Sequence, residues 1–180
     1  GKDPDVPALY KEAIEHYREA INFDPNDADA HNNLALVLVN MVCRGIRIDG
    51  KDPDVPALYK EAIDHCRAVL QQPGALGNEL NLVWLYGKLN DIAHARNALD
   101  KCKERSQQGF TQNDAELELA IYYLILEDDN HEALAKEVER LLDLGYRSVG
   151  WDFSPVINLV PDHPMHEKII ELSDRASKSE

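Results

Sequence analysis

The sequence is poor in basic residues and in residues that break regular structure. Only 19 lysines and arginines face 33 aspartates and glutamates, which gives a formal net charge of −14 at neutral pH. Nucleic acids and anionic membranes attract basic surfaces, so we expect neither as a partner and favour basic or neutral proteins and peptides over acidic ones. Nine glycines and nine prolines in 180 residues argue against a chain dominated by loops.

Cysteine is equally scarce. Cys43, Cys66 and Cys102 lie far apart and form no C-x-x-C pair, so the sequence predicts neither a disulfide framework nor a zinc site. We expect all three to be small buried hydrophobic side chains. Separated thiols, together with the lack of any Asn-x-Ser/Thr acceptor, predict a reducing, cytoplasmic location. No apolar run reaches the ~18 residues that a membrane-spanning helix needs.

Sequence motifs of catalysis are also missing. The chain has no glycine-rich phosphate loop and no serine in a nucleophile elbow. Residues 163–167 read HPMHE, which is not the HExxH order of a zinc protease. An EF-hand loop counted from residue 49 would place Lys51, Pro53 and Lys60 at the positions of calcium ligands, which none of them fits. We therefore expect no metal, no cofactor and no enzymatic activity.

What the chain does contain is an internal repeat. The sequence GKDPDVPALYKEAI occupies residues 1–14 and recurs unchanged at residues 50–63. In each copy an acidic, proline-containing loop leads into a helix, since Pro7 and Pro56 fit a first helical turn, where a missing N–H loses no hydrogen bond. Loops normally vary faster than the elements they join. We therefore expect the second loop to contact a partner or the neighbouring copy, through Asp49, Lys51, Asp52 and Asp54. A duplication without a function of its own remains the alternative.

Helical periodicity continues through most of the chain. It predicts helices at about residues 7–23, from 28 onward, and at about 56–72, 78–88, 92–105, 113–127 and 131–144. Asp27 is the expected cap of the second helix, and Gly145 is expected to end the seventh. No strand pattern of useful length competes with these helices.

The last part of the chain changes character. An aromatic segment at residues 151–153 is followed by Ser154, an expected helix cap, and by Pro155 in the first turn of a short helix. A final helix over about residues 163–177 is expected to close the end of the structure with Ile169, Ile170 and Leu172, because the last unit of a stacked array otherwise exposes an apolar face.

Small and large residues recur along these helices at the spacing of a known repeat. The matching positions are Ala13, Tyr17, Ala20, Pro25, His31, Leu34, Ala35, Leu38, Ala62, Cys66, Val69, Leu82, Tyr86, Ala95, Leu99 and Cys102. With this pattern the chain resembles the tetratricopeptide repeat (TPR) family. The match weakens beyond about residue 105, where Glu137 and Arg140 occupy apolar positions of the family, and ~15 extra residues separate Leu38 from Ala62.

The resemblance implies an all-α fold, an antiparallel helix-pair solenoid that winds as a right-handed superhelix and forms one domain over residues 1–180. It implies a partial repeat at 1–27, a repeat with an inserted loop (44–55) at 28–73, a repeat at 76–109, a divergent helix pair at 111–145 and a helical capping tail at 146–180.

Members of the family bind extended or helical peptides on a concave face lined by the first helix of each pair. By position, the resemblance implies that this face presents Asn32, Asn33, Leu36, Asn40, Asn81, Trp84 and Lys88. Asparagine can donate to and accept from a peptide main chain, and a tryptophan is an effective interface anchor. The alternatives are that the asparagines hold the scaffold together and that Trp84 packs within the chain. The lysines and arginines of a carboxylate-binding TPR domain are absent, because Asn32, Leu36, Gly77 and Asn81 stand at their positions.

These observations favour a cytoplasmic adaptor that binds a peptide or a partner protein. The alternative is a structural self-assembly module in which the duplicated loop and the end helices join copies, so a homo-oligomer stays open. The identity of a partner is beyond what the sequence indicates.

Overall fold

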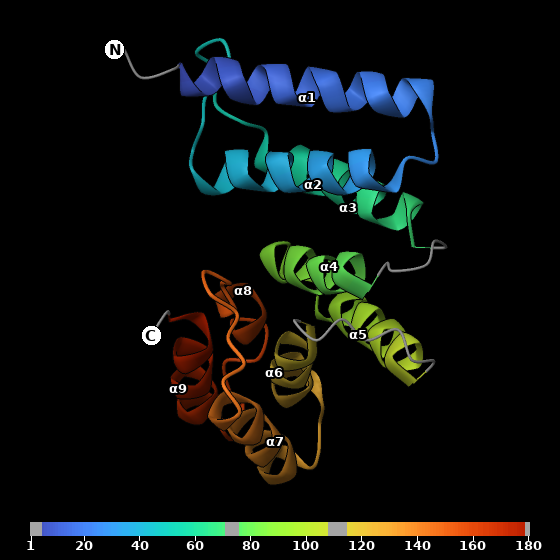
Figure 1. The fold of residues 1–180 in the computed structure, drawn as a ribbon. Helices are drawn as coiled ribbons and strands as arrows, with labels where there is room; N and C mark the ends of the chain where they lie inside the picture. Colours follow the sequence, from blue (N-terminus) through green and yellow to red (C-terminus); the bar gives the residue numbers. More distant parts are fainter. Residues whose placement is uncertain (1–4, 71–75, 108–114, 179–180) are drawn as a thin grey trace. The chain divides into compact units, whose positions relative to one another are not determined.

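The computed structural model describes residues 5–70, 76–107 and 115–178, without the side chains of 76–78 and 106–107. Within these ranges the chain forms nine α-helices and no β-strand beyond one isolated bridge (Figure 1). The predicted all-α class is confirmed. Contacts divide the chain into two compact units, residues 1–78 and 79–180, and each is described by itself. The predicted single domain stays a prediction.

The first unit consists of α1 (Val6–Phe23), α2 (Ala28–Cys43) and α3 (Val55–Ala68), and α2 packs against both of the others (Figure 1). The Asp27 carboxylate accepts a hydrogen bond from the Ala30 amide at 2.9 Å, as expected of the cap of α2. Leu34 and Leu38 are almost fully buried. The predicted end of the third helix near residue 72 lies outside the described residues.

The two copies of the repeated sequence have different surroundings. In α3, Tyr59 and Ala62 are buried, with exposed fractions of 6% and 0%, whereas the identical Tyr10 and Ala13 of α1 are only half-buried. The isoleucine that follows this alanine is buried in both copies, as Ile14 and Ile63. Burial of this sequence is therefore decided by the neighbouring elements and not by the sequence itself.

The loop before α3 is built on a tight turn. Ile48 and Lys51 pair across Asp49 and Gly50, whose φ angles of 51° and 74° are those that an Asp-Gly hairpin turn requires. The Asp49 carboxylate lies 3.0 Å from the Lys11 ammonium of the first copy, so the tip of the loop touches α1. Among the other loop residues, Asp52 pairs with Arg47 at 2.8 Å, Asp54 caps α3 through the Ala57 amide at 3.2 Å, and Lys51 is exposed. Contact of this loop with a partner stays a prediction.

A histidine pair joins α2 to α3. His31 Nε2 lies 3.1 Å from the Pro25 carbonyl, which can only accept, so this nitrogen carries the proton and His31 Nδ1 is left as an acceptor. His65 Nδ1, 2.9 Å from His31 Nδ1, must therefore donate. Around His65 stand Glu61, 3.8 Å from its Nε2, and Arg18 of α1, 2.6 Å from that carboxylate. Burial, followed by the nearby His31, lowers the pKa of His65.

The lowered pKa of His65 predicts acid sensitivity of the first unit. The folded state favours the neutral imidazole of His65, so the unfolded chain binds more protons than the folded chain as the pH falls. The contribution of His65 to the stability of the folded state is therefore complete above about pH 6.5, the ordinary pKa of histidine. It is lost as the pH falls through the lower pKa of the folded state. We expect the urea midpoint to fall less between about pH 7.5 and 5.5 in His65→Gln than in the wild type.

The repeat supplies a matched control for this experiment. His16 occupies the same place in the first copy and lies 3.5 Å from Glu12, yet 68% of its side chain is exposed. His16→Gln should keep the acid sensitivity of the wild type. If the two variants respond identically to pH, the buried pair is not the source of the effect.

The second unit contains α4 (Leu76–Lys88, from Glu79 onward), α5 (Ile92–Gln107), α6 (Glu116–Leu126), α7 (His131–Asp143), α8 (Ser154–Ile157) and α9 (His166–Ser177). α6 packs against α5 and α7, and the tail helix α9 packs against both α6 and α7 (Figure 1). Gly145 follows α7 with a φ of 93°, as expected of a glycine that ends a helix. The predicted start of α6 near residue 113 lies outside the described residues.

One buried ion pair in this unit has no counterpart in the sequence predictions. The side chain of Glu79 is only 2% exposed, and its carboxylate lies 2.6 Å from Arg105 Nε of α5. Burial raises the pKa of Glu79, and Arg105 opposes that rise. An acidic residue gives no sequence signal of burial, because it is normally exposed.

Three local predictions were wrong. The cap of α8 is not Ser154, since the Asp152 carboxylate accepts hydrogen bonds from the Ser154 amide and hydroxyl. Ile170 does not close the core together with Ile169 and Leu172, because it is 38% exposed whereas those two are 1% and 0% exposed. Cys43, the last residue of α2, is exposed, unlike Cys66 and Cys102.

Candidate functional site

One face of α2 is left open between its two neighbours. Asn33, Leu36 and Asn40 follow one another at spacings of three and four residues, so they lie on the same side of the helix. Leu36 is 39% exposed, Asn40 is exposed and Asn33 is half-buried. Asp29 and Cys43, both exposed, extend the stripe by one turn in each direction. These five residues define what we name the α2 face.

The asparagines of α2 differ in how much hydrogen-bonding capacity is already used. Asn40 Nδ2 donates to the Leu36 carbonyl at 2.9 Å, a bond within the helix that supports the scaffold alternative for this residue. Asn32 lies at the edge of the α2 face, and its Oδ1 is buried without a hydrogen-bond partner among the described residues. A buried acceptor without a partner is costly, so Asn32 gains if a ligand donates to it.

The corresponding face of α4 is in contact with the chain's own tail. The Trp84 indole donates from Nε1 to the Asp152 carbonyl at 2.8 Å. Lys88 Nζ lies 3.6 Å from the Asp152 carboxylate and 4.8 Å from the centre of the Trp84 ring. Trp84 therefore does pack within the chain, against the tail segment, and part of its surface stays exposed. Asn81, one turn before Trp84, is half-buried.

A glycine of α4 permits this contact. A Cβ at Gly87 would lie 2.9 Å from the carbonyl carbon and oxygen of Pro155, so the main chain of α8 rests directly on α4 at this point. Pro155, Val156 and Ile157 are all buried. Sequence reasoning gave Gly87 no role, because its reason lies in a segment far along the chain.

Gly87→Ala therefore tests the docking of the tail on α4. In an exposed helix, replacing glycine by alanine would stabilise the helix by about 1 kcal/mol. At Gly87, however, the added methyl group would enter space that is already occupied, which costs about 1–3 kcal/mol. The atoms in that space belong to the main chain of Pro155, which cannot rotate away as a side chain could. We expect a net loss of stability in urea unfolding, with Asn97→Ala on the exposed side of α5 as the control. A Gly87→Ala variant that is as stable as the wild type, or more stable, would contradict this packing.

The predicted binding residues thus fall into two sets. Asn32, Asn33, Leu36 and Asn40 gather on and beside the α2 face in the first unit, while Asn81, Trp84 and Lys88 follow one another along α4 in the second. Gly77 belongs to the part of α4 whose side chains are not described. Binding by either set stays a prediction.

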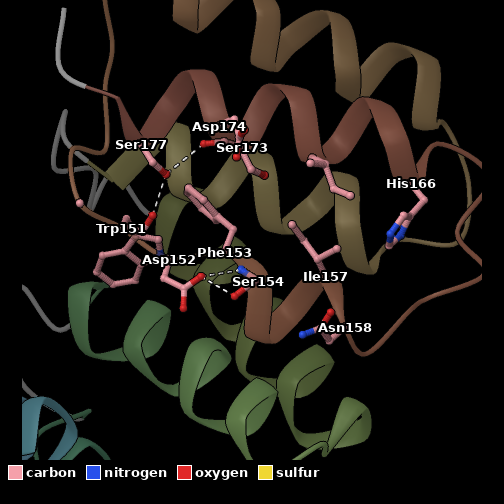
Figure 2. A pocket seen from close by; sticks show the side chains of 12 residues that line it. Trp151, Asp152, Phe153, Ser154, Ile157, Asn158, His166, Ser173, Asp174 and Ser177 are labelled. Carbon is pink, nitrogen blue, oxygen red and sulfur yellow. Dashed lines mark hydrogen bonds between the residues drawn. The ribbon is translucent and has the colours of Figure 1, made fainter. Parts of the chain in front are cut away.

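A cavity that sequence reasoning missed lies between α8 and α9 (Figure 2). Its volume is about 480 Å³, within the range of ligand-binding pockets. α9 lines it with His166, Ile170, Ser173 and Ser177, which share one face of the helix by their spacing of three and four residues. We name this cavity the α8–α9 groove.

The described residues contain neither a metal-binding cluster nor a membrane-spanning helix. No group of three or more His, Cys, Asp or Glu side chains there is arranged to hold a metal ion. None of the described helices combines the length and the apolar character that crossing a membrane requires.

Comparison with known proteins identifies the repeats. A family model described as TPR repeat matches residues 10–42, and a second, described as tetratricopeptide repeat, matches residues 80–108. Neither the curated proteins nor the solved structures gave a match. The matches and the all-helical architecture confirm the resemblance and the predicted helix-pair fold.

Proposed function

We propose that this chain, which carries tetratricopeptide repeats at residues 10–42 and 80–108, is an adaptor that binds a peptide or partner protein on the α2 face. Such repeats generally mediate interactions between proteins. The observation that carries the proposal is that Asn33, Leu36 and Asn40 lie in one open stripe, with Leu36 exposed although it is a large apolar residue.

The chemistry of the α2 face suits a peptide main chain. Leu36 offers an apolar contact at the centre of the stripe, and the amide side chains of Asn33 and Asn40 flank it by about one helical turn on each side. An amide has both donors and acceptors, so it can bond to peptide N–H and C=O groups without selecting a side chain. Asn32 adds a buried acceptor at the edge. This combination favours binding of peptides with an affinity that depends little on the peptide's sequence.

The predicted binding residues of α4, namely Asn81, Trp84 and Lys88, have a smaller role in the same proposal. Because the Trp84 indole nitrogen already bonds to Asp152, only the exposed part of the ring is left for an apolar contact. Lys88 is likewise engaged with Asp152. We therefore expect Asn81, Trp84 and Lys88 to contribute less than the α2 face.

The charge of the chain supports a choice of partner. With a net charge of −14, long-range attraction accelerates encounters with basic partners and opposes encounters with acidic ones. We propose a basic or neutral partner in the cytoplasm.

Selection of peptides from a random display library, followed by isothermal titration, tests the function. Leu36→Asp should weaken the selected peptides by about tenfold or more, because an interface anchor is worth about 1–2 kcal/mol and the new charge would be desolvated. Asp64→Asn, on the exposed side of α3, should leave the affinity unchanged.

Three results would count against the proposal. Equal affinity of the wild type and Leu36→Asp for every selected peptide removes the α2 face from the site. Equal affinity of Trp84→Ala removes Trp84. A library without binders, combined with light scattering that shows concentration-dependent oligomers, would favour self-assembly through the duplicated loop and the end helices.

A further inference from the structure

The α8–α9 groove is an elongated cavity with two different ends. Figure 2 shows Trp151 and Ser177 at one end and Asn158 and His166 at the other. Since 11 residues of helix separate His166 from Ser177, the groove follows α9 for roughly 16 Å, the length of about five residues of extended chain. Its middle is apolar and is lined by Phe153, Ile157 and Ile170.

Two polar atoms in the groove lack a partner. Ser173 is 6% exposed, and its buried hydroxyl makes no hydrogen bond to any described residue. Figure 2 shows its side chain pointing from α9 toward α8. His166 Nδ1, near the other end, is also buried, and none of the described residues bonds to it. By contrast, Ser177 on the same face bonds to the Trp151 and Ser173 carbonyls at 2.6 and 3.0 Å.

A buried polar atom without a partner costs free energy that an occupant can recover. Ser173 and His166 lie seven residues apart along α9, about 10 Å, so one small polar group cannot reach both. A peptide main chain, which presents an N–H or C=O group at every residue, can reach both.

The ionised groups of the groove have one sign. In the part of the chain that the structure describes, no lysine or arginine lines it, and its carboxylates are those of Asp152 and Asp174. Their side chains are 52% and 64% exposed. Each has a weak cationic neighbour, Lys88 at 3.6 Å and Lys178 at 3.7 Å, respectively. A ligand cation at this end would replace or join these solvent-screened pairs at little cost.

We propose that the α8–α9 groove binds a short extended peptide that carries a lysine or arginine beside apolar residues. The basic side chain lies at the end formed by Asp152 and Asp174, and the apolar side chains contact Ile157 and Ile170. The peptide main chain bonds to Ser173 and His166. This site is separate from the α2 face and does not depend on the function proposed above.

The test uses a capped leucine-arginine-leucine tripeptide as the probe, added to the full chain labelled with nitrogen-15. We expect amide shifts at Gly150, Ser173 and Ser177. Ser173→Ala should weaken binding about threefold to tenfold, the effect of one lost hydrogen bond. Asp174→Asn should weaken it by a similar factor, and the loss should shrink at high salt. Asp162→Asn, an exposed acid outside the groove, is the matched control and should bind like the wild type.

Two further probes separate the parts of the proposal. A capped leucine-glutamate-leucine peptide should not bind, and butylguanidine, which has the cation but no peptide group, should bind more weakly than the arginine peptide and equally well to wild type and Ser173→Ala. The proposal is overturned if the arginine peptide causes no shifts in the groove, if the glutamate peptide binds equally, or if Asp174→Asn and Asp162→Asn behave alike. Because Asp174 is exposed, that last comparison stands even where Ser173→Ala fails to fold. Leu36→Asp should not change this binding, so failure here leaves the α2 face untouched.

Discussion

Packing of α2 between α1 and α3 is the constraint on which the first unit depends. A helix buried on two sides keeps only a narrow stripe for other contacts, and here that stripe is the α2 face, with Asn33, Leu36 and Asn40 at its centre. The same packing creates the His31–His65 contact, because it brings two imidazoles together in a partly buried position. Structure and binding capacity in this unit therefore come from one arrangement of helices.

The second unit uses the equivalent helix differently. α4 gives part of its face to the tail, through the bond from Trp84 to Asp152 and the close approach of Pro155 to Gly87. That docking stabilises α8, and α8 then forms one wall of the groove against α9. The tail therefore covers part of the surface of α4 and at the same time forms the α8–α9 groove.

The sequence predicted most helices and their signals, because these are local: Asp27 caps α2, Gly145 follows α7, and the spacing of Asn33, Leu36 and Asn40 puts them on one face. The sequence did not predict which face of each helix is covered by a neighbouring element. Tyr10 and Tyr59 stand in identical sequences yet differ in burial, and Ile170 and Cys43 are exposed although the pattern predicts both to be buried. The groove was missed because residues 150–158, which line it together with α9, are placed by tertiary contacts such as that between Trp84 and Asp152, 68 residues apart.

Binding on the open stripe of α2 is the central claim, and chemical-shift mapping tests it most directly. Titration of a library-selected peptide into the nitrogen-15-labelled chain is predicted to shift the amides and side-chain amides of Asn33 and Asn40 and the amide of Leu36, with smaller shifts along α4. Saturable shifts that leave these three residues unchanged and appear elsewhere would contradict the account.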